Sequence, residues 1–482
     1  MDLSFASKSV LIDGSWSGAA SGATLPVENP STGETIGTIA ACGQGDVDAA
    51  VAAAHGAQAG AWGRMTATER GRILSVMGRL VTEQADALAW LEMTDVGKPM
   101  TQARADVTAL ARYLEFYGGA ADKVHGETIP FQAGYTVYTL REPFGVTGHI
   151  IPWNYPMQII GRSVVAALAM GNSAVLKPAE QASLTAIAFG RIALEAGLPD
   201  GALNIVTGTG AAAGAALAGH PDIQHLSFTG SNAVGTAIQT AGAAHAVPVT
   251  LELGGKSPQL VFADADLDKA IPSLLRAGIQ NAGQTCSAGS RILVQRAIHD
   301  TLVARLAEQF AALRAGPAGD DLDVGPLISG QQHKRVLEYI AQGRAELTVA
   351  AEGQAIADAP AGGYYVPPIL FTNVPGTHRL AQEEIFGPVV VVIPFDDEDE
   401  AVAIANGTPY GLVAGVWTSD GGRQMRLARR LHAGQVFLNN YGAAGGVELP
   451  FGGVGRSGHG REKGMEALLS FSALKTVAAY HG

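Results

Sequence analysis

SAVLKPAEQASLTAIAFGRIALEAGLPDGALNIV, residues 173–206, contains the pattern that decides the fold class of this chain. Two short apolar runs, SAVLK at 173–177 and LNIV at 203–206, enclose a segment of helical periodicity over 184–196. A buried strand, a helix and a second buried strand form the repeating unit of a parallel sheet with helical connections. The same alternation runs from about 145 to 253 and predicts a doubly wound α/β domain. Its helices are expected over 158–170, 184–196, 211–218 and 232–241.

The segments on either side of this series extend the α/β prediction. Upstream, the pattern is mainly helical, with helices expected over 46–61, over 67–90 behind the capping-box sequence TATE, and over about 101–118. YTVYTLRE at 135–142 alternates as a strand does, but no helix follows it, so we interpret it as an arm that leaves the main body. Downstream, a second alternating series predicts another α/β domain. Its strands are expected at 258–262, 290–294, 389–395, 413–417 and 435–438, and its helices at 265–281, 300–314 and 398–405.

Length and composition limit the class of protein. A chain of 482 residues exceeds what one hydrophobic core usually fills, so two or three domains are expected. The formal net charge of −12 is spread along the chain apart from the run DDEDE at 396–400, which is expected to cap a helix and face solvent. Basic residues do not gather in the sequence, which argues against a nucleic-acid partner.

The two cysteines and the apolar runs bear on where the protein works. Cys42 and Cys286 stand in settings that do not suggest a disulfide, and secreted proteins of this size commonly carry more cysteines, so a reducing compartment is favoured. The start, MDLSFASKSVLIDGSW, lacks a basic region followed by an apolar one, and no run of about 18 residues is uninterruptedly apolar. We expect a cytoplasmic protein with no membrane partner.

NAGQTCSAGSR, residues 281–291, surrounds Cys286 with small and polar residues. A cysteine used for packing usually lies among branched aliphatic residues, whereas a reactive thiolate needs backbone donors and room for a substrate. The small neighbours allow backbone N–H groups to approach an oxyanion on the carbon that the sulfur attacks. From this stretch alone, a nucleophile and an inert buried thiol remain two open interpretations.

Three stretches are candidate contacts for a phosphate or ribose in the first α/β series. VTGTGAAAG at 206–214 has suitably spaced glycines, and its alternative is a tight strand-to-helix turn. SFTGSNAVG at 227–235 is the stronger candidate because Ser231 stands where a helix begins, and free N–H groups there attract a pyrophosphate. LKPAE leaves Lys177 and Glu180 at the carboxyl edge of the sheet, where ligands bind in such folds. Together these stretches suggest a dinucleotide.

Seven motifs occur in the order and approximate spacing of the aldehyde dehydrogenase superfamily, which the chain resembles from about residue 10 to its C-terminus. They are PWNYP at 152–156, LKPAE at 176–180, FTGS at 228–231, ELGGKSP at 252–258, GQTCS at 283–287, EEIFGP at 383–388 and PFGG at 450–453. Any one could occur by chance, but seven in order are very specific. The resemblance implies an NAD(P)-dependent oxidoreductase that converts an aldehyde to an acid. It also implies two doubly wound α/β domains and a small β oligomerisation arm.

The resemblance further implies a covalent mechanism. Cys286 would attack the aldehyde carbon to give a thiohemiacetal, a hydride would pass to the nicotinamide, and the resulting thioester would be hydrolysed. The Asn154 amide and the Cys286 backbone N–H would hold the oxyanion, and Glu252 would activate the cysteine or the water. Taken alone, Asn154 could cap a turn between two prolines and Glu252 could be an ordinary strand-end carboxylate.

The cofactor contacts follow from the same resemblance. The residues implied are Ser231 for the pyrophosphate, Lys177 and Glu180 for the adenosine ribose, Glu384 and Phe386 for the nicotinamide ribose, and Trp153 as a further contact. A carboxylate at 180 accepts hydrogen bonds from ribose hydroxyls but repels a 2′-phosphate, so NAD is expected over NADP. Lys177 partly offsets that repulsion, which leaves NADP as a weaker alternative. No metal site is assigned.

In the helix after PWNYP the chain departs from many members of the superfamily. Ser163 stands where many relatives carry a lysine, so any proton relay assigned to that lysine is in doubt. Arg162 resembles the arginine with which succinic semialdehyde dehydrogenases bind their substrate's carboxylate, but Gln280 replaces their second arginine. Arg162 could equally pair with a structural carboxylate. Tyr155 and Phe451 fall where the family lines its tunnel with aromatic rings, which suits a semialdehyde or aromatic aldehyde with an acidic or polar tail.

The resemblance also divides the chain into domains. They are an NAD-binding domain over 1–122 and 144–253, a catalytic domain over 254–455, and an oligomerisation arm over 123–143 and 470–482. The arm is expected to pair with the C-terminal strand, around 472–480, of a neighbouring chain in a homodimer or homotetramer. A short apolar edge left in water would otherwise invite aggregation.

Three other classes of protein are weighed against this one. A cysteine hydrolase would pair Cys286 with a histidine, but none of the 12 histidines stands in such a motif. An acylating dehydrogenase would pass the thioester to coenzyme A, and such relatives usually lack the carboxylate that stands here as Glu252. A binding or structural protein of this fold would not need both residues. Oxidation of an aldehyde panel with NAD, with and without coenzyme A, separates these classes.

Overall fold

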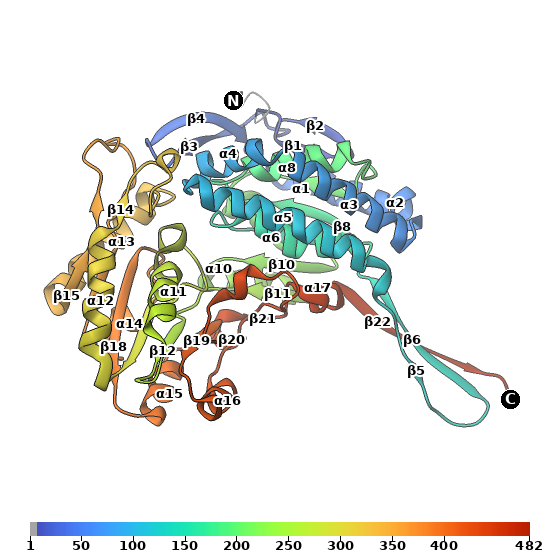
Figure 1. The fold of residues 1–482 in the computed structure, drawn as a ribbon. Helices are drawn as coiled ribbons and strands as arrows, with labels where there is room; N and C mark the ends of the chain where they lie inside the picture. Colours follow the sequence, from blue (N-terminus) through green and yellow to red (C-terminus); the bar gives the residue numbers. More distant parts are fainter. Residues whose placement is uncertain (1–6) are drawn as a thin grey trace.

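A computed structural model describes residues 7–482, which form two large sheets covered by helices and a small three-stranded sheet (Figure 1). The first large sheet has the strand order β2-β1-β9-β8-β7-β10-β11-β21. Its parallel strands are β7 (Val146–Ile150), β8 (Ser173–Lys177), β9 (Leu203–Ile205), β10 (His225–Thr229) and β11 (Val249–Glu252). Antiparallel strands extend the sheet on both sides: β1 (Val10–Ile12) and the edge strand β2 (Ser15–Ser17) beyond β9, and the edge strand β21 (Gly458–His459) beyond β11. The doubly wound prediction is confirmed, because the chain runs outward from β7 and then returns to place β10 on its other side.

The strand register brings several motifs to one edge of this sheet. Ile150 at the end of β7 is aligned with Lys177 on one side and with Phe228 on the other. Thr229, at the end of β10, is aligned with Glu252 at the end of β11. The order reverses between β7 and β10, and ligands bind at such a switch point in doubly wound sheets.

Helices connect these strands, and two of the connections contain a π-helical turn, at Ile160–Val164 and at Gly210–Gly214. They are α6 (Pro156–Ile159), the π-helical turn η3 (Ile160–Val164), α7 (Val165–Ala169), α8 (Leu184–Glu195), α9 (Ala215–Ala218) and α10 (Asn232–Ala243). The helix predicted over 158–170 is therefore present, but the turn that carries Arg162 is wider than an α-helical turn. Such turns are frequent at functional sites.

The N-terminal part of the chain packs helices beside this sheet (Figure 1). They are α1 (Gln44–Ala59), α2 (Ala61–Arg64), α3 (Ala67–Glu83), α4 (Ala85–Val96) and α5 (Met100–Ala120). The capping box is confirmed, since the Glu69 backbone N–H donates to the Thr66 hydroxyl and the Thr66 backbone N–H donates to the Glu69 carboxylate. The single helix predicted over 67–90 is wrong, because the backbone of Gln84 leaves the helical region and separates two helices. The strands before residue 41, which include the hairpin β3 (Thr24–Asn29) and β4 (Glu34–Ala40), were not predicted.

The second large sheet has the order β15-β17-β18-β13-β12-β19-β20, which repeats the same outward and returning path. Its strands are β12 (Pro258–Val261), β13 (Arg291–Gln295), β15 (Thr348–Glu352), β17 (Ile369–Thr372), β18 (Val389–Phe395), β19 (Val413–Trp417) and β20 (Gln435–Leu438). Its helices are α11 (Leu267–Ile279), α12 (His299–Ala312), α13 (Gly330–Glu346), α14 (Arg379–Gln382), α15 (Glu398–Asn406) and α16 (Gly421–Arg430), and β14 (Arg314–Ala315) pairs with β16 (Gln354–Ala355). We did not predict α13, whose buried stripe of Val336, Tyr339, Ile340 and Gly343 is narrow and contains a glycine.

The arm corrects one prediction. Strands β5 (Thr128–Ile129), β6 (Tyr135–Pro143) and β22 (Ser472–Tyr480) form its three-stranded sheet, which projects away from the rest of the molecule (Figure 1). The expectation that β22 pairs with the arm of a neighbouring chain is wrong, because it pairs along its whole length with β6 of its own chain. The physical reason is that α17 (Gly464–Ser470) packs against α7 and delivers the following residues to the base of the arm.

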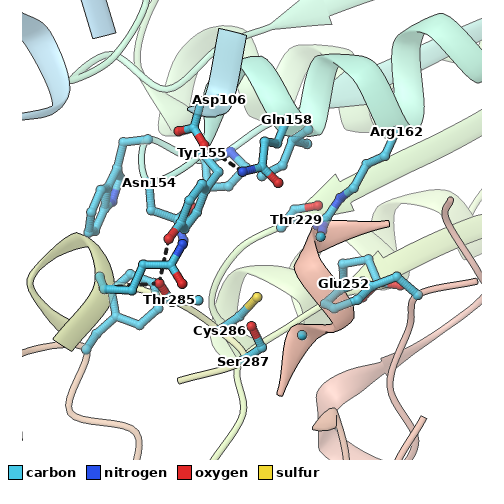
Figure 2. A pocket seen from close by; sticks show the side chains of 18 of the residues that line it. Asp106, Asn154, Tyr155, Gln158, Arg162, Thr229, Glu252, Thr285, Cys286 and Ser287 are labelled. Carbon is cyan, nitrogen blue, oxygen red and sulfur yellow. Dashed lines mark hydrogen bonds between the residues drawn. The ribbon is translucent and has the colours of Figure 1, made fainter. Parts of the chain in front are cut away.

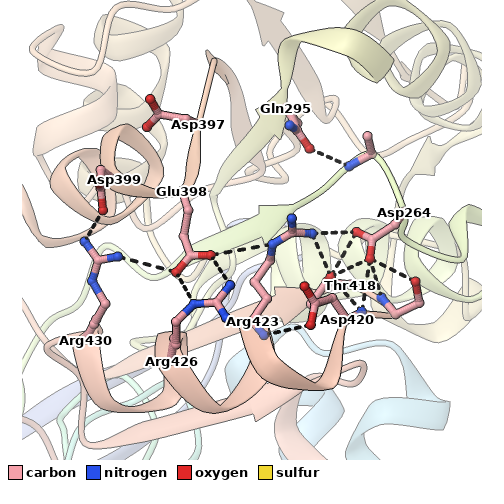
Figure 3. Close-up of polar contacts among 12 residues, drawn as sticks. Asp264, Gln295, Asp397, Glu398, Asp399, Thr418, Asp420, Arg423, Arg426 and Arg430 are labelled. Carbon is pink, nitrogen blue, oxygen red and sulfur yellow. Dashed lines mark hydrogen bonds and ion pairs between the residues drawn. The ribbon is translucent and has the colours of Figure 1, made fainter.

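The acidic run DDEDE takes part in a network of ion pairs with α16 (Figure 3). Asp397 caps α15 as predicted, but Glu398 is mostly buried and its carboxylate lies 2.7 Å from Arg426. Arg430 contacts Glu398 and Asp399, while Arg423 contacts Asp264. The expectation that basic residues do not gather is therefore wrong for α16, although carboxylates offset most of its arginines.

Within residues 7–482, none of the helices combines the length and the apolar character needed to cross a membrane. The N-terminal segment was expected to lack a leader, and its residues 1–6 lie outside the described part of the chain.

Candidate active site

A cavity of about 1460 Å³ lies where the carboxyl ends of the two parallel sheets meet (Figure 2). Its lining includes the loop after β7, the ends of β10 and β11, and the loop between α11 and β13. Cys286, Glu252 and Asn154, which are far apart in sequence, all line this one cavity. Trp153, Tyr155, Arg162, Ser231, Gln280, Glu384, Phe386 and Phe451 line it as well.

The loop that carries Cys286 has an unusual backbone. Asn281, Ala282 and Gly283 have φ values of 50°, 54° and 72°, so consecutive residues adopt the left-handed conformation. A Cβ on Gly283 would lie 2.1 Å from the Gly387 carbonyl oxygen, so only glycine fits there. The Gln284 side chain braces the loop, because its amide donates to the Asn281 carbonyl and its oxygen accepts from the Ile328 backbone N–H. These small and polar neighbours of Cys286 therefore serve to build a strained, braced loop.

Burial dominates the acidity of the Cys286 thiol. Burial raises its pKa to about 12, while the Arg162 guanidinium and a hydrogen bond from the Ser287 backbone act in the opposite direction. The thiol packs against the apolar cluster that contains Phe437 and Phe451. At neutral pH the resting cysteine is thus protonated, and it needs a nearby base to become a nucleophile.

Glu252 is placed to act as such a base. It is the last residue of β11 and is only 1% exposed, and neither carboxyl oxygen has a hydrogen-bond partner within residues 7–482. Its pKa is raised well above the ordinary value by burial and by the Glu462 carboxylate, and Arg162 and Arg461 lower it in part. A buried carboxyl without a partner costs stability, which is typical of a functional group.

The glycines after Glu252 permit a close approach of three chain segments. A Cβ on Gly254 would lie 2.3 Å from a carboxylate oxygen of Glu384, and a Cβ on Gly255 would lie 2.4 Å from the carbonyl oxygen of Cys286. The Gly255 backbone N–H donates to the Glu384 carboxylate at 3.0 Å. The LGG sequence is therefore required because the end of β11 passes between the cysteine loop and Glu384.

Asn154 presents an amide to the same cavity, next to the loop that carries Cys286. It follows β7, is buried, and donates from Nδ2 to the Gln284 carbonyl oxygen at 3.0 Å. Its own carbonyl oxygen on the backbone accepts from the Asn281 side chain at 3.0 Å. The amide is thus held by the cysteine loop, and Nδ2 carries a second hydrogen for another acceptor.

Arg162 pairs with a structural carboxylate and also lines the cavity. Its guanidinium forms an ion pair with Glu462, which is completely buried, and lies 4.8 Å from the centre of the Phe451 ring. It also lines the cavity, where Figure 2 shows it extending from its helix toward Cys286 and Glu252. Ser163, on the same turn, donates to the Ile159 carbonyl and contacts a ring nitrogen of His149. Arg162 therefore pairs with a structural carboxylate and faces the site at once.

Tyr155 is fixed by polar contacts on two sides. Its hydroxyl lies 2.9 Å from the Thr285 hydroxyl, next to Cys286 (Figure 2). The Lys98 ammonium lies 3.8 Å from the centre of its ring and forms ion pairs with the buried carboxylates of Glu92 and Asp106. This arrangement holds the aromatic wall of the cavity in one orientation.

The predicted cofactor residues separate into two groups. Ser231 caps α10 and lines the cavity, and Trp153 and Phe386 lie edge to face with ring centres 5.4 Å apart. Lys177 and Glu180 form an ion pair at 3.2 Å at the end of β8, and the structure does not bring them into the cavity lining.

Several residues of the site were missed from the sequence. Asp106 lines the cavity and accepts a hydrogen bond from Gln158 at 2.6 Å. The sequence did contain a signal for Asp106, because it is a charged residue in the apolar stripe of α5 that contains Ala103, Val107 and Leu110. Glu462, Lys463 and Arg112 also belong to the site or its support, and their loop and surface positions carried no sequence signal.

Comparison with known proteins agrees with this geometry. The family model described as the aldehyde dehydrogenase family matches residues 16–477. Aldehyde dehydrogenase family 2 member B4, a mitochondrial protein of Arabidopsis thaliana, is 44% identical over 473 residues, covering 97% of this chain and 87% of that protein.

Solved structures show the same relationship. A Burkholderia cenocepacia protein provisionally described as an aldehyde dehydrogenase has 62% identity and a TM-score of 0.98, covering 98% of this chain and 100% of that one. The NAD+ complex of an aldehyde dehydrogenase from Bacillus cereus has 40% identity and a TM-score of 0.95, covering 98% of this chain and 96% of that one. From its sequence motifs, its fold and these matches over nearly its whole length, the chain belongs to the aldehyde dehydrogenase family.

Proposed function

We propose that this aldehyde dehydrogenase uses NAD to oxidise an aldehyde to a carboxylic acid through a thiohemiacetal and a thioester on Cys286. One observation carries the proposal: the Cys286 thiol lines the same cavity as the Glu252 carboxyl, which has no hydrogen-bond partner within residues 7–482. A nucleophile beside an unpartnered base is the arrangement that covalent catalysis needs.

The residues at the switch point of the first sheet fit a dinucleotide. Gly230 and Ser231 line the cavity where α10 begins, and the first N–H groups of a helix have no partner within it. The buried Thr229 hydroxyl, which also lines the cavity, has no hydrogen-bond partner among the described residues, and a cofactor oxygen would satisfy it. When bound, the nicotinamide would accept the hydride from the substrate carbon. Glu384, Phe386 and Trp153 would hold that end of the cofactor.

The preference for NAD over NADP rests on the end of β8. Glu180 would accept hydrogen bonds from the adenosine ribose and repel a 2′-phosphate. Its ion pair with Lys177 offsets part of that charge, so weaker use of NADP is included in the proposal.

In the first chemical step, the ionised Glu252 carboxylate takes the proton of the Cys286 thiol. The sulfur then forms a bond to the aldehyde carbon, and the electron pair of the C=O bond moves to oxygen. The Asn154 amide and the Cys286 backbone N–H would donate to this oxyanion. Arg162 supports the step because its positive charge lowers the pKa of both groups that must lose a proton, Cys286 and Glu252.

After hydride transfer, Glu252 releases the thiol proton to solvent, and in the hydrolytic step it takes a proton from a water molecule whose oxygen attacks the thioester carbon. The C–S bond breaks, its electron pair returns to the sulfur, and the carboxylic acid leaves. Burial has already raised the pKa of Glu252, which makes its carboxylate a stronger base once it is ionised.

The substrate class follows from the walls of the cavity. Tyr155, Phe437, Tyr441 and Phe451 supply aromatic surface for an aromatic or chain aldehyde. Gln280 and Arg162 would contact an acidic or polar tail, although the charge of Arg162 is already balanced by Glu462. From these two residues alone we expect only a modest preference for acidic aldehydes.

The experiment mixes the protein with NAD or NADP and a panel of neutral and acid-bearing aldehydes, and follows the absorbance of the reduced cofactor. Oxidation with NAD in the absence of coenzyme A is the expected result. Oxidation only with coenzyme A would indicate the acylating class instead. Ester or amide hydrolysis without any dinucleotide would indicate a cysteine hydrolase.

A further inference from the structure

We infer that Lys463 is a second cation at the substrate end of the cavity and that, with Arg162, it binds a carboxylate or sulfonate at the distal end of the aldehyde. The inference rests on the proposed function and names the substrate class of the same site. Lys463 would also supply the second positive charge that is missing because Gln280 replaces the second arginine of succinic semialdehyde dehydrogenases.

The backbone places Lys463 beside Arg162. Glu462, the ion-pair partner of Arg162, exchanges two backbone hydrogen bonds with Phe451, at 2.7 and 2.8 Å. Lys463 follows directly and has a φ of 61°, so the chain turns sharply at a residue that is not glycine. Its ammonium donates to the Gly445 carbonyl oxygen at 3.2 Å, and Lys463, Arg162, Phe451 and Gly445 all line the cavity. A lysine held in the left-handed region is an energetic cost that a functional site explains.

One cation at this end of the cavity, Lys463, has no carboxylate partner among the described residues. Arg162 pairs with Glu462, and Arg112 pairs with Glu448 at 2.5 Å and with Glu115 at 2.8 Å. Lys463 is only 9% exposed and forms no ion pair among residues 7–482. Each of the two arginines thus has a carboxylate partner and Lys463 has none, so a ligand with a single anionic tail could pair with Lys463.

The electrostatics of Lys463 agree with this arrangement. The pKa of Lys463 is lowered to about 8, mainly by burial and also by the neighbouring Arg162 guanidinium, while Glu448 opposes the shift. An anion between the two cations would relieve their repulsion, whereas a neutral aldehyde would leave it in place. The aromatic rings of Phe451 and Tyr441 would then cover the apolar part of such a substrate.

The test compares Lys463→Met and Lys463→Arg with the unmodified protein on a matched pair of substrates, 4-carboxybenzaldehyde and 4-methylbenzaldehyde. Loss of the charge-assisted hydrogen bond should lower kcat/KM of Lys463→Met for the acidic aldehyde by about ten- to a hundredfold, mainly through KM. The fold decrease in kcat/KM of Lys463→Met for the neutral aldehyde should be at least about tenfold smaller than that for the acidic aldehyde. Lys463→Arg should retain the preference for the acidic aldehyde. Lys269→Met, which removes an exposed lysine outside the cavity, is the matched control and should leave both rates unchanged.

The outcomes separate the inference from the function on which it rests. Equal losses on both aldehydes, or an acid preference that survives in Lys463→Met, would overturn the role of Lys463. If the unmodified protein oxidises neither aldehyde with NAD, the proposed function fails instead.

If Lys463→Met does not fold, the pH dependence of the acid preference decides the question. The ratio of kcat/KM values for the two aldehydes should fall in the unmodified protein as pH rises past the pKa of Lys463. The groups facing Lys463 are Arg162, Arg112, Glu448 and Glu462, and an arginine at 463 would stay charged, so Lys463→Arg should keep its ratio. A ratio that does not change with pH in the unmodified protein would overturn the inference.

Discussion

Replacement of Asn154 by alanine tests the assignment of the oxyanion site. Asn154 Nδ2 carries two hydrogens, and the structure uses one of them in a bond to the Gln284 carbonyl oxygen. Removing one donor from an oxyanion site typically lowers kcat by about 10²- to 10³-fold, or about 2.7–4 kcal/mol of transition-state stabilisation. The lost bond to Gln284 is expected to cost only about 0.5–1.5 kcal/mol of folding stability. The Asn281 side chain also donates to that carbonyl, at 3.4 Å, so the loop should remain in place.

The assay is stopped-flow measurement of the first turnover, followed by the absorbance of the reduced cofactor, with cofactor affinity measured separately by titration. Asn406→Ala is the matched control. The Asn406 side-chain amide also donates to a backbone carbonyl oxygen, that of Arg430, at 2.9 Å, but Asn406 does not line the catalytic cavity. We expect a slow first turnover, unchanged cofactor affinity and a folded protein in Asn154→Ala. A first turnover slowed by less than about tenfold, or an equal loss in Asn406→Ala, would refute the assignment.

Four further predictions follow from the site and the arm. Cys286→Ala should abolish oxidation and leave NAD binding intact, and more than about a hundredth of the original activity would contradict covalent catalysis. Glu252→Gln should slow both the first turnover and the steady-state rate, because Glu252 accepts a proton from the thiol and from the hydrolytic water, and an unchanged steady-state rate would remove Glu252 from the mechanism. Because burial raises the pKa of Cys286 and of Glu252, kcat/KM should rise with pH through the neutral and alkaline range. Arg162→Leu should move that rise to higher pH, since the guanidinium lowers both pKa values, and a flat profile would count against this assignment. The exposed Leu474 and Tyr480 of the arm predict a dimer or tetramer in light scattering that Leu474→Glu weakens, and a monomer at micromolar concentration would contradict this.

Much of the fold was predictable because short-range patterns determine secondary structure. The alternation of apolar strands and amphipathic helices from about 145 onward identified both parallel sheets, since buried parallel strands and their crossovers leave a periodic signal. The pattern did not show the break at Gln84, because both flanking helices have helical periodicity and only the backbone of one residue departs from it. It also could not show which strand pairs with β22, because pairing depends on where α17 packs.

The candidate site divides in the same way. Parallel strands end at one edge of a sheet, which indicated a ligand site near Lys177, Glu180 and Ser231, whereas Asn154 and Glu252 were assigned to the site through the family resemblance. Contacts between segments that are distant in sequence left no such signal. The ion pair of Arg162 with Glu462 is one of these, and the neighbouring position of Lys463 is another.

By itself, the sequence determined the fold class, the edge of each sheet at which ligands bind, and the chemical groups available for catalysis, because these depend on local periodicity and residue type. The tertiary structure alone decided which charges neutralise one another. Residues 162 and 462 meet only after the chain has folded, and their pairing leaves the positive charge of Lys463 without a carboxylate partner among residues 7–482. Burial then changes the pKa values of Cys286, Glu252 and Lys463, because a charge in a desolvated site depends on every neighbour that packing brings to it.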